Sequence, residues 1–127
     1  MTSTQTLSPA YGRPDIGLRS PRSIEYDLIA RVTQRLRSAW EARKQDFAAL
    51  AAALHDNNRL WSTLAADVAE PGNGLPAALR AQLFYLFQFT AEHSRAVLND
   101  GASAEVLIDI NTAVMRGLRG TGPEGGA

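Results

Sequence analysis

Two histidines are the side chains of this chain best suited to proton transfer or metal binding near neutral pH. Neither His55 nor His93 has a histidine or a carboxylate three or four residues away, the spacing of a metal site on a helix. The chain has no cysteine, which excludes disulfides, zinc fingers and thiol nucleophiles. The glycines between Pro71 and Pro76 fit a turn better than a phosphate-binding loop. Although a spatial Ser–His–Asp arrangement stays open, we expect no enzyme, no cofactor and no metal site.

Positive and negative charges balance in this chain of 127 residues, which has 13 Lys and Arg and 13 Asp and Glu. A balanced chain has no broad electrostatic field for gripping phosphate backbones or anionic lipid, so we expect neither nucleic-acid nor membrane binding. Acidic residues are interspersed in the densest basic cluster, which therefore reads as a solvated helix face. This cluster comprises Arg13, Arg19, Arg22, Arg31, Arg35, Arg37, Arg43 and Lys44.

No stretch of the sequence fits a secretory signal or a membrane span. The first eight residues are polar, and the longest apolar run, residues 83–89, is interrupted by Gln88. That run is far shorter than the roughly 20 residues needed to cross a bilayer. We therefore expect a soluble, cytoplasmic protein.

The sequence predicts an all-α protein, a small antiparallel bundle of about four helices joined by short loops. Asp46 and Ser103 are the predicted N-caps of the second and fourth helices. We expect a single helical domain over residues 20–118, between an irregular N-terminal arm at residues 1–19 and a flexible Gly-rich tail at residues 119–127. The four helices are predicted at residues 20–43, 46–70, 76–98 and 103–118.

Apolar residues recur at helical spacing in every predicted helix, which identifies a candidate core. We expect Leu54 and Trp61 in the core from the second helix, Leu83 from the third and Ile110 from the fourth.

The third and fourth helices have more apolar residues than one buried face requires. On a helical wheel Tyr85 and Phe89 project away from the core stripe of the third helix, and Phe84 lies a quarter turn from its centre. Ile108 and Met115 project in the same way from the fourth helix. Either the third helix is central and surrounded, or these side chains form a surface that binds an apolar segment of a partner.

Two asparagines beside Trp61 are also unusual, because asparagine is a poor helix former and costly to bury without a partner. Asn57 and Asn58 fit a satisfied polar contact that fixes helix register, or a contact with the backbone of a bound segment. Arg59 faces away from Trp61, as a solvated side chain or as the rim of such a site.

Several short strings resemble the flagellar biosynthesis regulator FlaF family of alphaproteobacteria. In chain order they are SPRSIE at residues 20–25, ALHDNNRLW at 53–61, LPAALR at 75–80, and LIDIN at 107–111 followed by GLRG at 117–120. Tyr11 also matches an N-terminal tyrosine of the family. The chain departs from the family at Asn58, where a second arginine is common, and beyond Gly120.

The resemblance implies a small cytoplasmic protein that supports flagellin synthesis and export. Members look like secretion chaperones that bind an apolar helical segment of flagellin, alongside a separate translational regulator of flagellin mRNA. We therefore expect a flagellin-binding chaperone or adaptor, with Phe84, Tyr85, Phe89, Ile108, Met115, Asn58 and Arg59 as partner-binding residues. Two alternatives stay open: a post-transcriptional regulator that acts on flagellin mRNA or on its translational regulator, and a homodimer that buries the same surface.

Overall fold

A computed structural model describes residues 21–120, which form four helices and no strand. They are α1 (Pro21–Glu41), α2 (Phe47–Ala69), α3 (Ala77–Asp100) and α4 (Glu105–Gly120). The predicted all-α class is therefore confirmed. The predicted arm at residues 1–19 lies outside the described residues, as does the predicted tail apart from residues 119 and 120, which belong to α4.

Local signals set the helix ends close to their predicted positions. Asp46 caps α2, since its carboxylate accepts a hydrogen bond from the Ala49 N–H at 3.0 Å. The Ser103 hydroxyl accepts from the Glu105 N–H at 3.0 Å at the start of α4. Gly101, at φ 75°, ends α3 two residues later than predicted, because only there can the chain reverse without strain.

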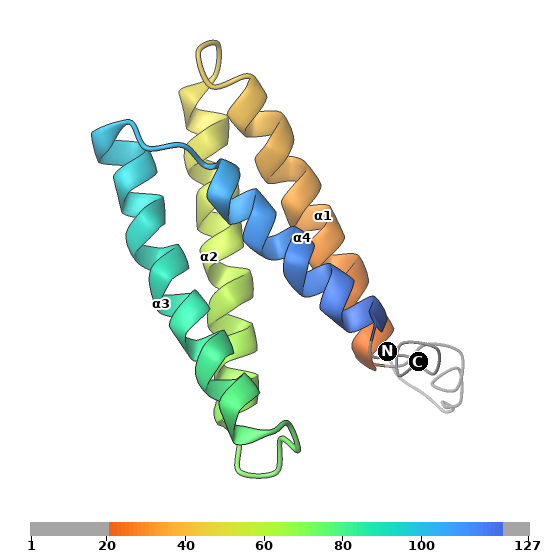
Figure 1. Ribbon diagram of the computed structural model, residues 1–127. Helices are drawn as coiled ribbons and strands as arrows, with labels where there is room; N and C mark the ends of the chain where they lie inside the picture. The colour runs from red at the N-terminus through yellow and green to blue at the C-terminus, as the bar shows by residue number, and fades with distance from the viewer. Residues whose placement is uncertain (1–20, 121–127) are drawn as a thin grey trace, which may run out of the picture.

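The helices do not close into a symmetric bundle (Figure 1). Neighbours α1 and α2 run antiparallel, and so do α2 and α3, whereas α4 returns along α1. Contact between α3 and α4 is slight, and the two helices diverge from the loop that joins them. The N-terminal half of α3 is consequently left with α2 as its neighbour. Within residues 21–120, every helix is too short or too polar to cross a membrane.

The core consists of two apolar clusters stacked along the bundle. One lies at the end where α1 meets α2 and α3 meets α4, and it includes Leu36, Leu54 and Leu107. The other joins Ile29, Val32 and Leu60 to half-buried side chains of α2 and α4. Leu54 and Trp61 are buried, as predicted.

A buried polar network joins α1, α2 and α4 beside these clusters. The Trp61 Nε1–H donates to Asn111 Oδ1 at 2.9 Å, and Asn111 Nδ2 donates to Asn57 Oδ1 at 2.8 Å and to Thr33 Oγ1 at 3.1 Å. All four side chains are at most 1% exposed. Since an unpaired polar group is costly to bury, these bonds favour this seating of α4, although the buried Asn57 Nδ2 has no hydrogen-bond partner within the described residues. Of the two roles considered for Asn57, a polar contact within the protein or a contact with a bound segment, the structure shows the first.

Asn111 also explains two errors in the predicted orientation of α4. The wheel placed Ile108 outward and Ile110 in the core, but Ile108 is 6% exposed and Ile110 is only half-buried. The prediction centred the buried face on apolar residues alone. Because Asn111 is buried, the inward face turns toward Ala104, Ile108 and Asn111, and away from Ile110.

Replacing Asn111 tests the weight of this network. Asn111→Ala removes the partner of three buried groups, and we expect the free energy of unfolding to fall by about 3–5 kcal/mol. Urea unfolding followed by Trp fluorescence measures the change. Asn99→Ala, on the exposed C-terminal end of α3, is the control and should change stability by no more than about 0.5 kcal/mol. Equal losses in the two variants would contradict a stabilising role for the network.

Candidate partner-binding surface

The N-terminal half of α3 is rich in large apolar side chains and contains none that is buried. We call residues 79–89 the α3 apolar segment. The exposed fraction is 39% for Leu79, 40% for Phe84 and 63% for Tyr85. The remaining large apolar residues of the segment are half-buried: Leu83, Leu86, Phe87 and Phe89.

The segment is open because its neighbours change along α3. Leu83 lies on the same side of the helix as Thr90 and Val97, which follow at intervals of about two turns. Thr90 and Val97 are buried, whereas Leu83, predicted to be core, is only half-buried. The start of α4 is near the C-terminal end of α3, and α4 then leans toward α1 (Figure 1). The inward side of α3 is therefore sealed at one end and open at the other.

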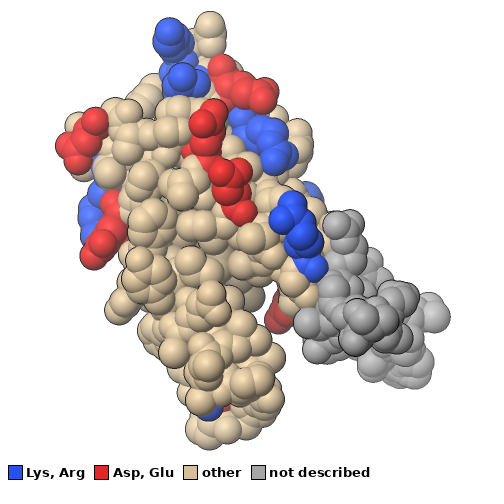
Figure 2. Space-filling model, in the orientation of Figure 1, with Lys and Arg blue, Asp and Glu red and all other residues tan. Residues whose placement is uncertain are grey.

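Apart from Arg80, the α3 apolar segment is also free of charge. Residues 81–91 include no Asp, Glu, Lys or Arg, and the nearest charged residues of α3 are Arg80 and Glu92. On the face in Figure 2, charged side chains gather over the upper part of the molecule. The lower lobe, where α2 ends and α3 begins, is almost entirely uncharged there. A contiguous apolar and uncharged surface of this kind is typical of a binding site for an apolar partner.

The three aromatic residues predicted to face outward behave differently. Phe84 and Tyr85 are exposed, and the Phe84 ring meets Phe87 edge to face, with centroids 6.0 Å apart. Phe89 is half-buried, packs against the larger core cluster and stacks on His93 at 5.3 Å. The His93 ring in turn donates from Nε2 to the Ser103 carbonyl at 2.7 Å. The outward placement of Phe89 was therefore wrong. Its ring packs against the core cluster and against His93, and the His93 bond to Ser103 links this part of α3 to the start of α4.

The back of α4 does not contribute the surface that the sequence predicted. Ile108 is buried, and Met115 is half-buried against the smaller core cluster. Both side chains face α1 and α2, because burial of Asn111 turns that side of α4 inward. The surplus apolar surface is therefore concentrated on α3.

Asn58 and Arg59 differ in their surroundings. Asn58 is half-buried, and its Oδ1 accepts a hydrogen bond from the Ser94 hydroxyl at 3.1 Å, which links α2 to α3. Asn58 thus makes a contact within the protein. Arg59 is exposed on α2. Its exposure is consistent both with a solvated side chain and with the rim of a binding site.

Four further apolar residues are exposed that the sequence analysis did not identify as surface: Leu28, Phe47, Leu79 and Val106. Phe47 is 53% exposed at the first position of α2. Of these residues, only Phe47 has an exposure that its position in the sequence could have predicted, because the first turn of a helix often extends beyond its packing partners. The exposure of Leu79 depends on where α4 lies.

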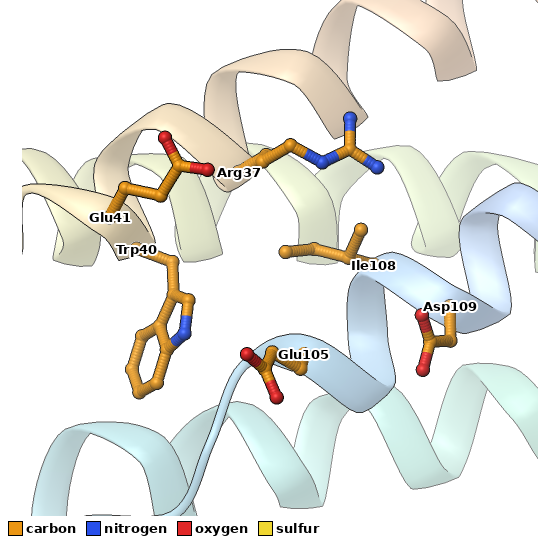
Figure 3. A pocket seen from close by; sticks show the side chains of 6 residues that line it. All are labelled: Arg37, Trp40, Glu41, Glu105, Ile108 and Asp109. Carbon is orange, nitrogen blue, oxygen red and sulfur yellow. The ribbon is translucent and has the colours of Figure 1, made fainter.

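A separate pocket of about 310 Å³ lies between the end of α1 and the start of α4 (Figure 3). Its walls combine one guanidinium with three carboxylates and two apolar side chains. Its lining residues are Arg37, Trp40, Glu41, Glu105, Ile108 and Asp109. The Trp40 ring is covered by the Arg43 guanidinium at 3.8 Å. Across residues 21–120, no three His, Asp or Glu side chains gather closely enough to hold a metal ion.

Phe89 and Tyr85 make a matched pair for separating core from surface. Phe89→Ser should lower the free energy of unfolding by about 2–4 kcal/mol, because it removes packing against the core. Tyr85→Ser should change it by less than about 0.5 kcal/mol, because that side chain is exposed. Thermal unfolding followed by circular dichroism compares them. A Phe89→Ser variant as stable as Tyr85→Ser would place Phe89 on the surface.

One comparison with known proteins identifies a family. The family model for the flagellar protein FlaF matches residues 8–118, which includes the α3 apolar segment and all but the last residues of α4. Comparison with curated proteins and with solved structures gave no match. The match spans most of the chain and agrees with the motifs found in the sequence, so this chain belongs to the flagellar protein FlaF family.

Proposed function

We propose that this flagellar protein is a cytoplasmic chaperone that binds flagellin through the α3 apolar segment. The observation that carries the proposal is an exposed, uncharged row of large apolar side chains in a chain of this family. The protein acts by binding and performs no catalysis. It covers an apolar helical segment of flagellin until the export machinery receives it.

The chemistry of the segment suits such a client. The terminal segments of flagellin are amphipathic and polymerise when free, so covering their apolar faces prevents premature assembly. Phe84 and Tyr85 offer large, rigid contact areas, which are common at the centres of protein interfaces. An affinity near 1 μM, about −8 kcal/mol, would still permit release for export.

Charge favours this function over binding of flagellin mRNA. The one cation in the α3 apolar segment is Arg80, which is half-buried and donates from Nε to the Leu75 carbonyl at 3.2 Å. Within the basic cluster, Arg35 of α1 pairs with Asp56 at 2.9 Å, and Arg43, which follows α1, lies over Trp40. RNA binding of the usual electrostatic kind needs cations directed at the backbone. The contact that we propose is apolar and should depend little on salt.

Two exposed aromatic residues provide the direct test. Phe84→Ser combined with Tyr85→Ser should weaken flagellin binding at least about tenfold, or about 1.4 kcal/mol, because apolar contact area is lost. Phe47→Ser is the matched control, since Phe47 is also an exposed aromatic residue but lies at the first position of α2, outside the segment. Isothermal titration with purified monomeric flagellin gives both affinities.

Three results would contradict the proposal. The first is equal flagellin affinity in the Phe84→Ser, Tyr85→Ser double variant and in the Phe47→Ser control. The second is binding of flagellin mRNA, but not of flagellin, with an affinity that falls steeply between 50 and 200 mM salt, on the order of the loss expected for phosphate contacts. The third is a dimer, detected by sedimentation, that flagellin leaves unchanged and that Phe84→Ser with Tyr85→Ser dissociates.

A further inference from the structure

The family match begins before the first helix. It starts at residue 8, whereas α1 starts at Pro21. Residues 8–20 are therefore part of the family pattern although they precede the helical domain. From here on, the N-terminal arm means residues 8–20, a narrower range than the arm predicted at residues 1–19. A segment retained in the family pattern outside the helices needs a partner surface or another role of its own.

The composition of the arm suits an extended ligand. Tyr11, Ile16 and Leu18 alternate with prolines and glycines at positions 9, 12, 14 and 17. Proline and glycine oppose helix formation, so this composition favours an extended chain over a helix. A chain of this kind can bury its apolar side chains by lying along an apolar surface.

The arm starts at the correct end of the molecule to reach the α3 apolar segment. Because α1, α2 and α3 alternate in direction, the start of α1 is at the same end of the bundle as the start of α3 (Figure 1). Extended, residues 8–20 span about 40 Å at about 3.3 Å per residue. The α3 apolar segment is about 16 Å long at 1.5 Å per residue. The extended arm is thus more than twice as long as the α3 apolar segment.

Charges agree with this placement. The arm includes Arg13 and Arg19 and one acidic residue, Asp15, so it is weakly basic. The C-terminal end of α2, next to the start of α3, has the exposed acidic residues Asp67 and Glu70. The negative end of the α2 helix dipole adds to this attraction. The α3 apolar segment itself has no charge between Arg80 and Glu92 that would oppose the apolar part of the arm.

We propose that the N-terminal arm of this chain covers the α3 apolar segment in the client-free protein, with Tyr11, Ile16 and Leu18 against it. Flagellin then displaces the arm. This displacement step rests on the proposed function, whereas the covered state does not. The covered state protects an apolar surface that would otherwise promote aggregation. The arm also lowers the apparent affinity for the client by the fraction of molecules in which it is bound.

The absence of cysteine makes a labelling test direct. Gln82→Cys places one thiol among the apolar residues of α3 without removing any of them, and its reaction rate with a maleimide reports exposure. In the full chain, Tyr11→Ser, Ile16→Ser and Leu18→Ser together should raise that rate at least about fivefold. Thr2→Ala, Ser3→Ala and Thr6→Ala together are the matched change in polar residues and should leave it unchanged. Ala52→Cys, which is exposed near the other end of α2, is the control thiol. Its reaction rate with the maleimide should be the same for the original, serine-substituted and alanine-substituted arms.

Flagellin separates this inference from the proposed function. With the original arm, added flagellin should slow labelling of Gln82→Cys, and the serine-substituted arm should bind flagellin several-fold more tightly. Equal labelling rates with both arms would overturn the arm proposal, even where flagellin protects the thiol and the chaperone function stands. An arm effect without protection by flagellin would support the arm proposal and contradict the chaperone function. A labelling rate that falls as protein concentration rises, whichever arm is present, would instead identify a second copy as the cover and overturn the arm proposal.

Discussion

The hydrogen bond from the Trp61 Nε1–H to Asn111 Oδ1 is the contact on which the other features of this structure depend. Asn111 is buried and also donates to α1 and α2, so these bonds favour the seating of α4 that leaves these groups paired. That seating directs α4 along α1 and away from α3. The exposed apolar surface of α3 and the polar network inside the bundle are thus two results of one constraint.

The side chains of α3 match this division. Its buried residues are Thr90, Ser94 and Val97, all in the C-terminal half and none of them large. Its large aromatic residues lie mainly in the half that has α2 alone as a neighbour. Removing apolar surface from water drives both folding and association. Such a helix contributes little to the core and keeps most of its apolar area for contact with another segment.

The two ends of the bundle consequently have different roles. At one end, the caps Asp46 and Ser103, the Gly101 turn and the larger core cluster hold the helices together. At the other end, α2 and α3 separate from α1 and α4 (Figure 1). Local stability is lower where fewer apolar contacts are buried, and binding surfaces are commonly found in such regions. The α3 apolar segment lies at this open end.

The sequence by itself determined the four helices, their ends to within two residues, the burial of Trp61 and the lack of charge over residues 81–91. Capping, helical periodicity and charge are properties of neighbouring residues, so they can be read locally. Tertiary structure alone decided that Ile108 is buried, that Phe89 packs inward and that Leu79 is exposed. A helical wheel shows in which directions a helix is apolar, but the neighbour in each direction depends on how the helices pack. Here a buried polar residue, Asn111, decided that packing, because its hydrogen bonds had to be satisfied inside the protein.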